Sequence, residues 1–146
     1  MHNTKKILVV EDNDDCRELL ARFVKSLGYK VFEAATGIEA IDRASAINPD
    51  LIIMDLRMPG MDGGETTARL KMSPSTKDIP VLINTAYTTC VDTRRALDAG
   101  AAGILHKPLN LATLHAVLRK YLSAGTRQRA FHQRKPTSRG QARLLR

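Results

Sequence analysis

The sequence lacks the features that mark several classes of protein. Its two cysteines, Cys16 and Cys90, have no CxxC or framework spacing, which argues against a zinc ribbon and a disulfide scaffold. No apolar run approaches the ~20 residues of a membrane span, and the apolar stretch behind MHNTKK is too short for a secretory signal. Together these absences predict a protein of the reducing cytoplasm. A chain of 146 residues, 43% of them hydrophobic, is long enough for one domain with its own core.

Acidic residues are absent from residue 124 to the end of the sequence, where seven basic residues lie. This segment carries most of the formal net charge of +8, because residues 1–123 hold 16 basic and 15 acidic residues. The composition predicts a nearly neutral folded domain over residues 1–123 and a basic, disordered tail over residues 124–146. The folded domain is not expected to bind nucleic acid. We interpret the tail as solvated, with an electrostatic contact to acidic lipid, nucleic acid or a partner as the alternative.

Short apolar runs alternate with segments of helical spacing along residues 1–123. The runs predict strands at residues 7–10, 30–34, 51–54, 81–83 and 104–105. Helices are predicted from an apolar stripe at 19–27, which ends before Gly28, and over 36–47, 62–72, 88–99 and 109–122. A strand–helix order repeated five times predicts a parallel sheet with helices on both faces. In such a sheet the functional crevice lies at the carboxyl ends of the strands.

Charged and hydroxyl side chains follow four of the predicted strands. Glu11 and Asp12 follow the first, Asp55 follows the third, Thr85 ends the fourth, and Lys107 follows the fifth. Three carboxylates in one place repel one another unless a cation lies among them. Mg²⁺ suits a site with few carboxylates, several waters and a phosphoryl oxygen. The arrangement therefore predicts transfer of a phosphoryl group to a carboxylate.

Four segments resemble the receiver domains of two-component response regulators. They are ILVVEDN at residues 7–13, LIIMDLRMPGMDG at 51–63, NTAY at 84–87 and AGAAGILHKPL at 99–109. The resemblance covers about Lys5 to Leu122 and stops before the tail. It implies a flavodoxin-like, doubly wound α/β fold, in which five helices cover a five-stranded parallel sheet of strand order 2-1-3-4-5.

The resemblance implies a metal-dependent phosphoacceptor site. Asp55 would accept the phosphoryl group from a phosphohistidine of a sensor kinase or a phosphotransfer protein. Asp12 and Asp55 would bind Mg²⁺ directly, Glu11 would bind it through water, and the backbone carbonyl of Arg57 would be a further ligand. Glu11 stands where the family more often has Asp, a difference that a water-mediated role tolerates.

The resemblance also implies how the phosphoryl group is sensed. Lys107 would contact a phosphoryl oxygen, and the Thr85 hydroxyl would move toward the phosphoryl group. The Lys107–Pro108 bond is expected to be cis. Output would be a protein–protein contact with a downstream partner. The face formed by the fourth helix, the fifth strand and the fifth helix is the candidate surface for a homodimer, although the sequence does not determine the oligomeric state.

Three residues are expected to modify this behaviour. Ile104 replaces the usual Tyr or Phe three residues before the lysine, so we expect weaker coupling or coupling without a large side-chain swing. Arg57 and Tyr87 lie two residues beyond Asp55 and Thr85. In the family these two positions border the phosphoryl group, so both bulky side chains are expected to obstruct water and lengthen the life of the phosphate.

Several of these residues have simpler interpretations. Asp14 and Asp15 are interpreted as acids at a helix N-terminus, and Asp62 as a helix cap rather than a site residue. His106 is expected at the surface. The remaining candidates are interpreted as packing residues and ordinary thiols, namely Met54, Met58, Met61, Cys16 and Cys90.

Three other functions compete with the receiver. A haloacid-dehalogenase-type phosphatase requires a second acid two residues past the nucleophile, where this sequence has Arg57. A flavodoxin-like cofactor binder requires a Ser/Thr/Gly-rich phosphate loop after the first strand, where this sequence has EDNDD. A degenerate receiver that acts as a scaffold is the third alternative. The sequence favours a phosphorylation-controlled switch that is not an enzyme.

Overall fold

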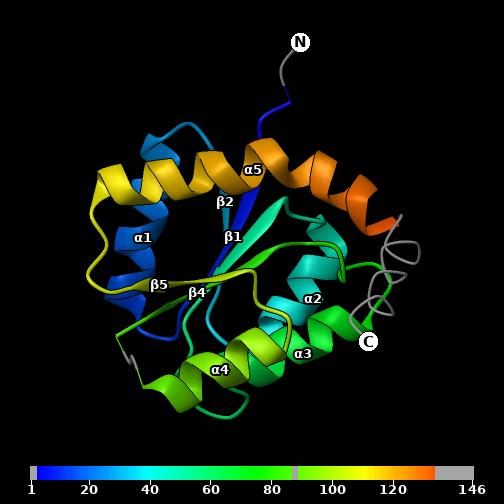
Figure 1. The fold of residues 1–146 in the computed structure, drawn as a ribbon. Helices are drawn as coiled ribbons and strands as arrows, with labels where there is room; N and C mark the ends of the chain where they lie inside the picture. Colours follow the sequence, from blue (N-terminus) through cyan, green and yellow to red (C-terminus); the bar gives the residue numbers. More distant parts are fainter. Residues whose placement is uncertain (1–2, 87–88, 134–146) are drawn as a thin grey trace.

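The structure is a computed structural model that describes residues 3–86 and 89–133. Strands and helices alternate along the chain (Figure 1). The strands are β1 (Lys6–Val10), β2 (Lys30–Ala34), β3 (Leu51–Met54), β4 (Val81–Thr85) and β5 (Gly103–His106). The helices are α1 (Asp14–Ser26), α2 (Gly37–Ile47), α3 (Gly63–Met72), α4 (Cys90–Asp98) and α5 (Leu111–Gln133). The predicted strand–helix alternation is confirmed.

The five strands form one parallel sheet in the order β2-β1-β3-β4-β5. Each strand is joined to the next by a helix, as parallel pairing requires. Helices α1 and α5 cover one face of the sheet, and α2, α3 and α4 cover the other (Figure 1). The doubly wound, flavodoxin-like α/β fold and its strand order are confirmed.

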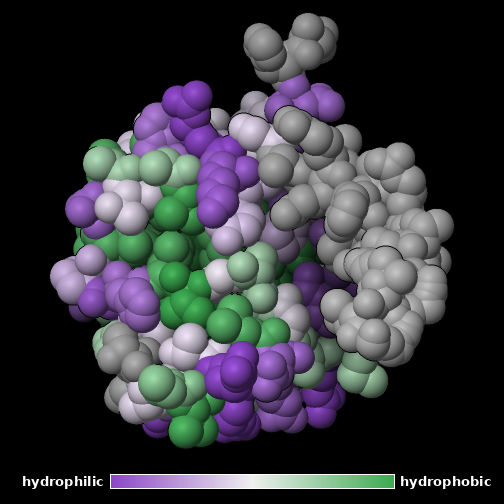
Figure 2. Space-filling model, viewed as in Figure 1, coloured by the Kyte–Doolittle hydropathy of each residue, from purple (hydrophilic) through white to green (hydrophobic). Residues whose placement is uncertain are grey.

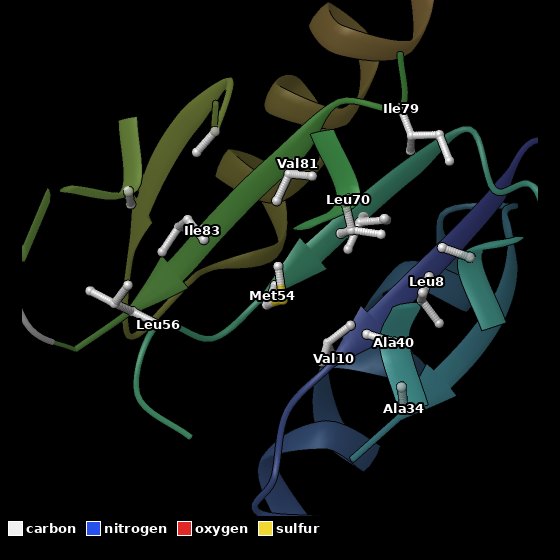
Figure 3. Close-up of a cluster of buried hydrophobic side chains, with 14 of the residues drawn as sticks. Leu8, Val10, Ala34, Ala40, Met54, Leu56, Leu70, Ile79, Val81 and Ile83 are labelled. Atoms are coloured by element: carbon white, nitrogen blue, oxygen red, sulfur yellow. The ribbon is translucent and has the colours of Figure 1, made fainter. Parts of the chain in front are cut away.

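The core consists of one apolar layer on each side of the sheet. All residues of β3 and β4 are buried, whereas the edge strands β2 and β5 keep partly exposed side chains. On one side, Leu8, Met54 and Ile83 of the sheet pack with side chains of α2 and α3 such as Ala40 and Leu70 (Figure 3). The layer on the other side contains Val9, Ile53 and Leu82 from the sheet, Leu20 and Val24 from α1, and Leu114, Leu118 and Leu122 from α5.

Polar side chains fix the starts of the helices. Thr36 Oγ1 accepts a hydrogen bond from the Glu39 N–H at 3.0 Å, which confirms the predicted start of α2. Asp62 Oδ1 accepts from the Glu65 N–H at 2.8 Å, so Asp62 is the cap of α3, as predicted. The cap of α1 is Asn13, and the predicted acids Asp14 and Asp15 lie in its first turn.

Asp62→Ala is expected to lower the free energy of unfolding by about 1 kcal/mol, because the Glu65 N–H loses its acceptor. Urea unfolding measures the change. Asp78→Ala is a matched control, since Asp78 is an exposed acid outside any helix start. Equal stabilities of the two variants would contradict the capping role.

The end of α5 differs from the sequence prediction. A helix ending at Leu122 was expected from the apolar stripe, but α5 continues to Gln133. The reason lies in composition, because alanine, arginine and glutamine in residues 124–133 favour helix without any apolar periodicity. The predicted division into a domain and a disordered tail stays a prediction, since residues 134–146 lie outside the described residues.

Within the described part of the chain, α5 included, no helix has both the length and the apolar character to cross a membrane.

Candidate functional site

The carboxyl edge of the sheet brings the predicted residues together. The backbone ladder continues past the strand ends and fixes their positions: the Asp55 N–H donates to the Val10 carbonyl at 3.0 Å, and the Lys107 N–H donates to the Thr85 carbonyl at 3.0 Å. The Lys107–Pro108 peptide bond is cis, as the resemblance implied. The side chains therefore start from a rigid edge, not from free loops.

Lys107 joins two carboxylates that come from different strands. Its Nζ lies 2.8 Å from Glu11 Oε1 and 3.5 Å from Asp55 Oδ2. The second oxygen of Glu11 accepts the Asn13 N–H at 3.1 Å. Glu11 and Asp55 are buried, with exposed fractions of 4% and 8%, so the ammonium neutralises charge where little water reaches it.

Glu11, Asp12 and Asp55 form the carboxylate cluster that the sequence predicted. One oxygen of each lies within 4.8 Å of the others, and Asp12 is the exposed member. Oxygen ligands at this spacing fit a hard divalent cation, and Mg²⁺ completes its octahedral coordination with water.

The electrostatics of the cluster favour a bound cation. Burial raises the pKa of Asp55 to about 6, and the negative charge of Glu11 adds to the rise, while Lys107 partly offsets it. For Lys107, burial lowers the pKa of the ammonium. The hydrogen bond to Glu11 and the charge of Asp55 outweigh this effect, so the pKa of Lys107 is raised overall. The site thus holds more negative charge than one lysine neutralises.

Three of the four other predicted site residues lie within the described part of the chain. Thr85 ends β4 and is fully buried. The Arg57 side chain is half-exposed and reaches α4, where its Nη2 lies 2.6 Å from Asp92 Oδ2. Ile104 is partly buried and packs against the apolar layer on the side of α2, α3 and α4. Tyr87 lies outside the described residues, and the roles assigned to all four stay predictions.

Three further residues that shape the site were not predicted from the sequence. Arg17 Nη1 donates to the Glu11 carbonyl at 2.8 Å, and its guanidinium pairs with Asp14 and Glu33. Gly63 lies against the Asp55 backbone so closely that a Cβ would overlap the Asp55 carbonyl oxygen. Asn84 is a buried amide one residue before Thr85. Asn84 alone left a signal, because it lies in the segment NTAY at residues 84–87 that carries part of the resemblance.

The structure also shows the exposure and packing of residues that were interpreted as non-functional. Cys16 and Cys90 are free and exposed, and His106 is exposed. Met54 and Met58 are buried in the apolar layer, which confirms packing. Asp62 is not a member of the carboxylate cluster, in agreement with its capping role.

Comparisons with known proteins agree with this site. The family model of the response regulator receiver domain matches residues 7–119. The chain is 32% identical over 119 residues to the polar-differentiation response regulator DivK of Brucella ovis, covering 82% of this chain and 97% of DivK. It is 35% identical over 118 residues to sporulation initiation phosphotransferase F of Bacillus subtilis, covering 81% of this chain and 94% of that protein.

A solved structure adds a metal to the comparison. The receiver domain of the sensor histidine kinase PA1611 from Pseudomonas aeruginosa, with a magnesium ion coordinated in its active site cleft, superposes with a TM-score of 0.78 at 31% identity. The match covers 83% of this chain and 99% of that domain. Family, fold and site thus agree, and the chain belongs to the response regulator receiver family of two-component signalling, whose members are phosphoacceptor switches and not classical enzymes.

Proposed function

We propose that Asp55 is the phosphoacceptor of this receiver and that its donor is a phosphohistidine on a histidine kinase or a histidine phosphotransfer protein. One observation carries the proposal: a buried carboxylate lies within 4.8 Å of two other carboxylates and within 3.5 Å of an ammonium. Burial and a cation partner prepare a carboxylate for nucleophilic attack in a site that holds the charge of a phosphoryl group.

In the transfer, a carboxylate oxygen of Asp55 attacks phosphorus in line with the donor P–N bond. The new O–P bond forms as the P–N bond breaks, the bonding electron pair stays on the histidine nitrogen, and the nitrogen takes up a proton from solvent. Lys107 is 3.5 Å from Asp55 and would neutralise the phosphoryl oxygens. Asp12, Asp55 and, through water, Glu11 would hold Mg²⁺, with the Arg57 carbonyl as a further ligand. When bound, Mg²⁺ supplies neutralisation of the transferring oxygens.

The test is incubation of the full chain with Mg²⁺ and a small phosphodonor such as acetyl phosphate, followed by intact mass spectrometry. One added phosphoryl group is expected, and Asp55→Asn or a metal chelator should each abolish it. Asp78→Asn, a change in an exposed acid, is the control and should label as the wild type does. Labelling that persists in Asp55→Asn would refute the site, and absence of labelling in the wild type would favour the scaffold alternative.

Arg57 and Tyr87 are proposed to slow hydrolysis of the aspartyl phosphate. The Arg57 guanidinium is held by Asp92 of α4 at 2.6 Å, which restricts this bulky side chain two residues beyond Asp55. Small residues at both positions should admit water and shorten the life of the phosphate. The decay of label after removal of the donor measures this, and slower decay in Arg57→Gly/Tyr87→Gly than in the wild type would contradict it.

Output is proposed to use the face formed by α4, β5 and α5. Figure 2 shows apolar surface near the centre of the view, between the regions that α4 and α5 occupy in Figure 1. Leu97 of α4 is 41% exposed, and Ile104 and Val117 are partly buried. A cytoplasmic partner or a second copy of the chain would cover this face after phosphorylation.

Ile104 already packs inward, so we expect signalling without a large swing of this side chain. A large reorientation of Ile104 on binding beryllofluoride would refute that.

A further inference from the structure

Asn84 is a buried polar residue without the hydrogen bond that burial demands. It is 6% exposed, and in the described part of the chain its side-chain oxygen Oδ1 accepts no hydrogen bond. The hydroxyls of three buried threonines, by contrast, each donate to a backbone carbonyl: those of Thr66, Thr67 and Thr76. A buried acceptor without a donor costs about 1–3 kcal/mol, which an apolar residue would avoid. Asn84 therefore requires a reason to be polar.

The register of the sheet places Asn84 on the face that carries the site. Leu82, two residues earlier, and Leu105, which pairs with Asn84 across β4 and β5, both belong to the layer under α1 and α5. Side chains two residues apart in a strand share a face. By the same alternation, Glu11 follows Val9 and Asp55 follows Ile53 on this face. Asn84 thus belongs to the last row of side chains at the carboxyl edge.

The Lys107 side chain must cross that row. Lys107 begins beyond β5, yet its Nζ contacts Glu11 beyond β1 and Asp55 beyond β3. In the order β1-β3-β4-β5, strand β4 lies between the start and the end of this reach. The path of Lys107 therefore passes over the end of β4, where Asn84 lies on the same face.

We infer that Asn84 is a positioning residue for Lys107, and that its Oδ1 accepts a hydrogen bond from the ammonium when Lys107 leaves Glu11 for a phosphoryl group on Asp55. The inference rests on the proposed function. In the present structure the ammonium donates a hydrogen bond to Glu11 Oε1 at 2.8 Å and lies 3.5 Å from Asp55 Oδ2. An ammonium has three hydrogens to donate, and the Asn84 carbonyl beneath its path supplies an acceptor that does not compete with the carboxylates for a metal. Asn84 Oδ1 is a buried acceptor without a donor, and Lys107 is the cation whose side chain extends over it.

The test measures binding of beryllofluoride, a phosphoryl mimic, to the full chain in Mg²⁺ by isothermal titration calorimetry. Asn84→Leu keeps the branched shape of the side chain and removes the acceptor, so its dissociation constant should rise roughly tenfold, as for loss of a hydrogen bond to a charged group. In a Lys107→Ala background the same substitution should have no further effect, because Asn84 acts through Lys107. The affinity for Mg²⁺ alone should change little, since Asn84 is not among the ligands.

A spectroscopic measurement on the wild type keeps the inference testable if Asn84→Leu fails to fold. The side-chain ¹³C carbonyl resonance of Asn84 should shift when beryllofluoride is added, and should not shift in Lys107→Ala. Unchanged beryllofluoride affinity in Asn84→Leu, or an equal loss in the Lys107→Ala background, would overturn this inference alone. If the wild type itself fails to bind beryllofluoride, the proposed function falls, and the inference falls with it.

Discussion

Lys107→Ala is expected to lower the free energy of unfolding of the metal-free protein by about 2 kcal/mol at neutral pH. The substitution leaves Glu11 and Asp55 buried beside each other without the ammonium that lies 2.8 and 3.5 Å from them. Removing one partner of a fully buried pair costs about 3–5 kcal/mol, and the smaller figure reflects that Lys107 is 26% exposed and water reaches part of the site.

Mg²⁺ should recover most of this loss, because a divalent cation among the three carboxylates replaces the missing charge. Urea unfolding in chelator and in saturating Mg²⁺ measures both effects. Lys77→Ala is the matched control, since Lys77 is an exposed lysine. Two results would be incompatible with the site as described: equal stabilities of the two variants in chelator, or a Lys107→Ala loss that Mg²⁺ does not reduce.

Most of the fold was predictable because the local signals agree with the global topology. The apolar runs of β3 and β4 could only be buried strands, and the Asp62 and Thr36 caps marked the starts of α3 and α2. The predicted end of α5 at Leu122 was wrong. It was placed where the apolar periodicity ends, whereas residues 124–133 continue the helix by intrinsic propensity.

The site was predictable as far as strand topology determines it. Residues that follow parallel strands must meet at one edge, so Glu11, Asp12, Asp55 and Lys107 could be assembled from the order of elements alone. Contacts between distant loops and helices follow no such rule. Two such contacts depend on how the helices pack and on the direction of the side chains. They are the ion pair of Arg57 with Asp92 and the hydrogen bond that Arg17 donates to the Glu11 carbonyl. Asn84 was visible as part of the segment NTAY at residues 84–87, but its missing hydrogen-bond partner appears only in three dimensions.

The pKa of Asp55 leads to a second stability prediction. Asp55→Asn should raise the free energy of unfolding in chelator at neutral pH by about 1–2 kcal/mol. The pKa of Asp55 is about 6 in the folded protein, above the value of about 4 expected in the unfolded chain. The folded state therefore binds the proton more tightly, and the stability of the wild type falls as pH rises through this interval. Asparagine carries no charge, so the advantage of the variant should be near zero below about pH 4 and complete above about pH 6.

The neighbours of Asp55 set the size and the reversal of this effect. Glu11 and Asp12 repel the Asp55 carboxylate, whereas Lys107 attracts it and loses part of that attraction in the variant, which limits the gain. Mg²⁺ binds only the carboxylate form, so saturating metal should erase the advantage of Asp55→Asn or reverse it. Asp78→Asn, an exposed substitution, should show neither the pH dependence nor the response to metal. If Asp55→Asn is less stable than the wild type in chelator at neutral pH, the carboxylate is not under electrostatic strain, and the reason for expecting a cation among these oxygens disappears.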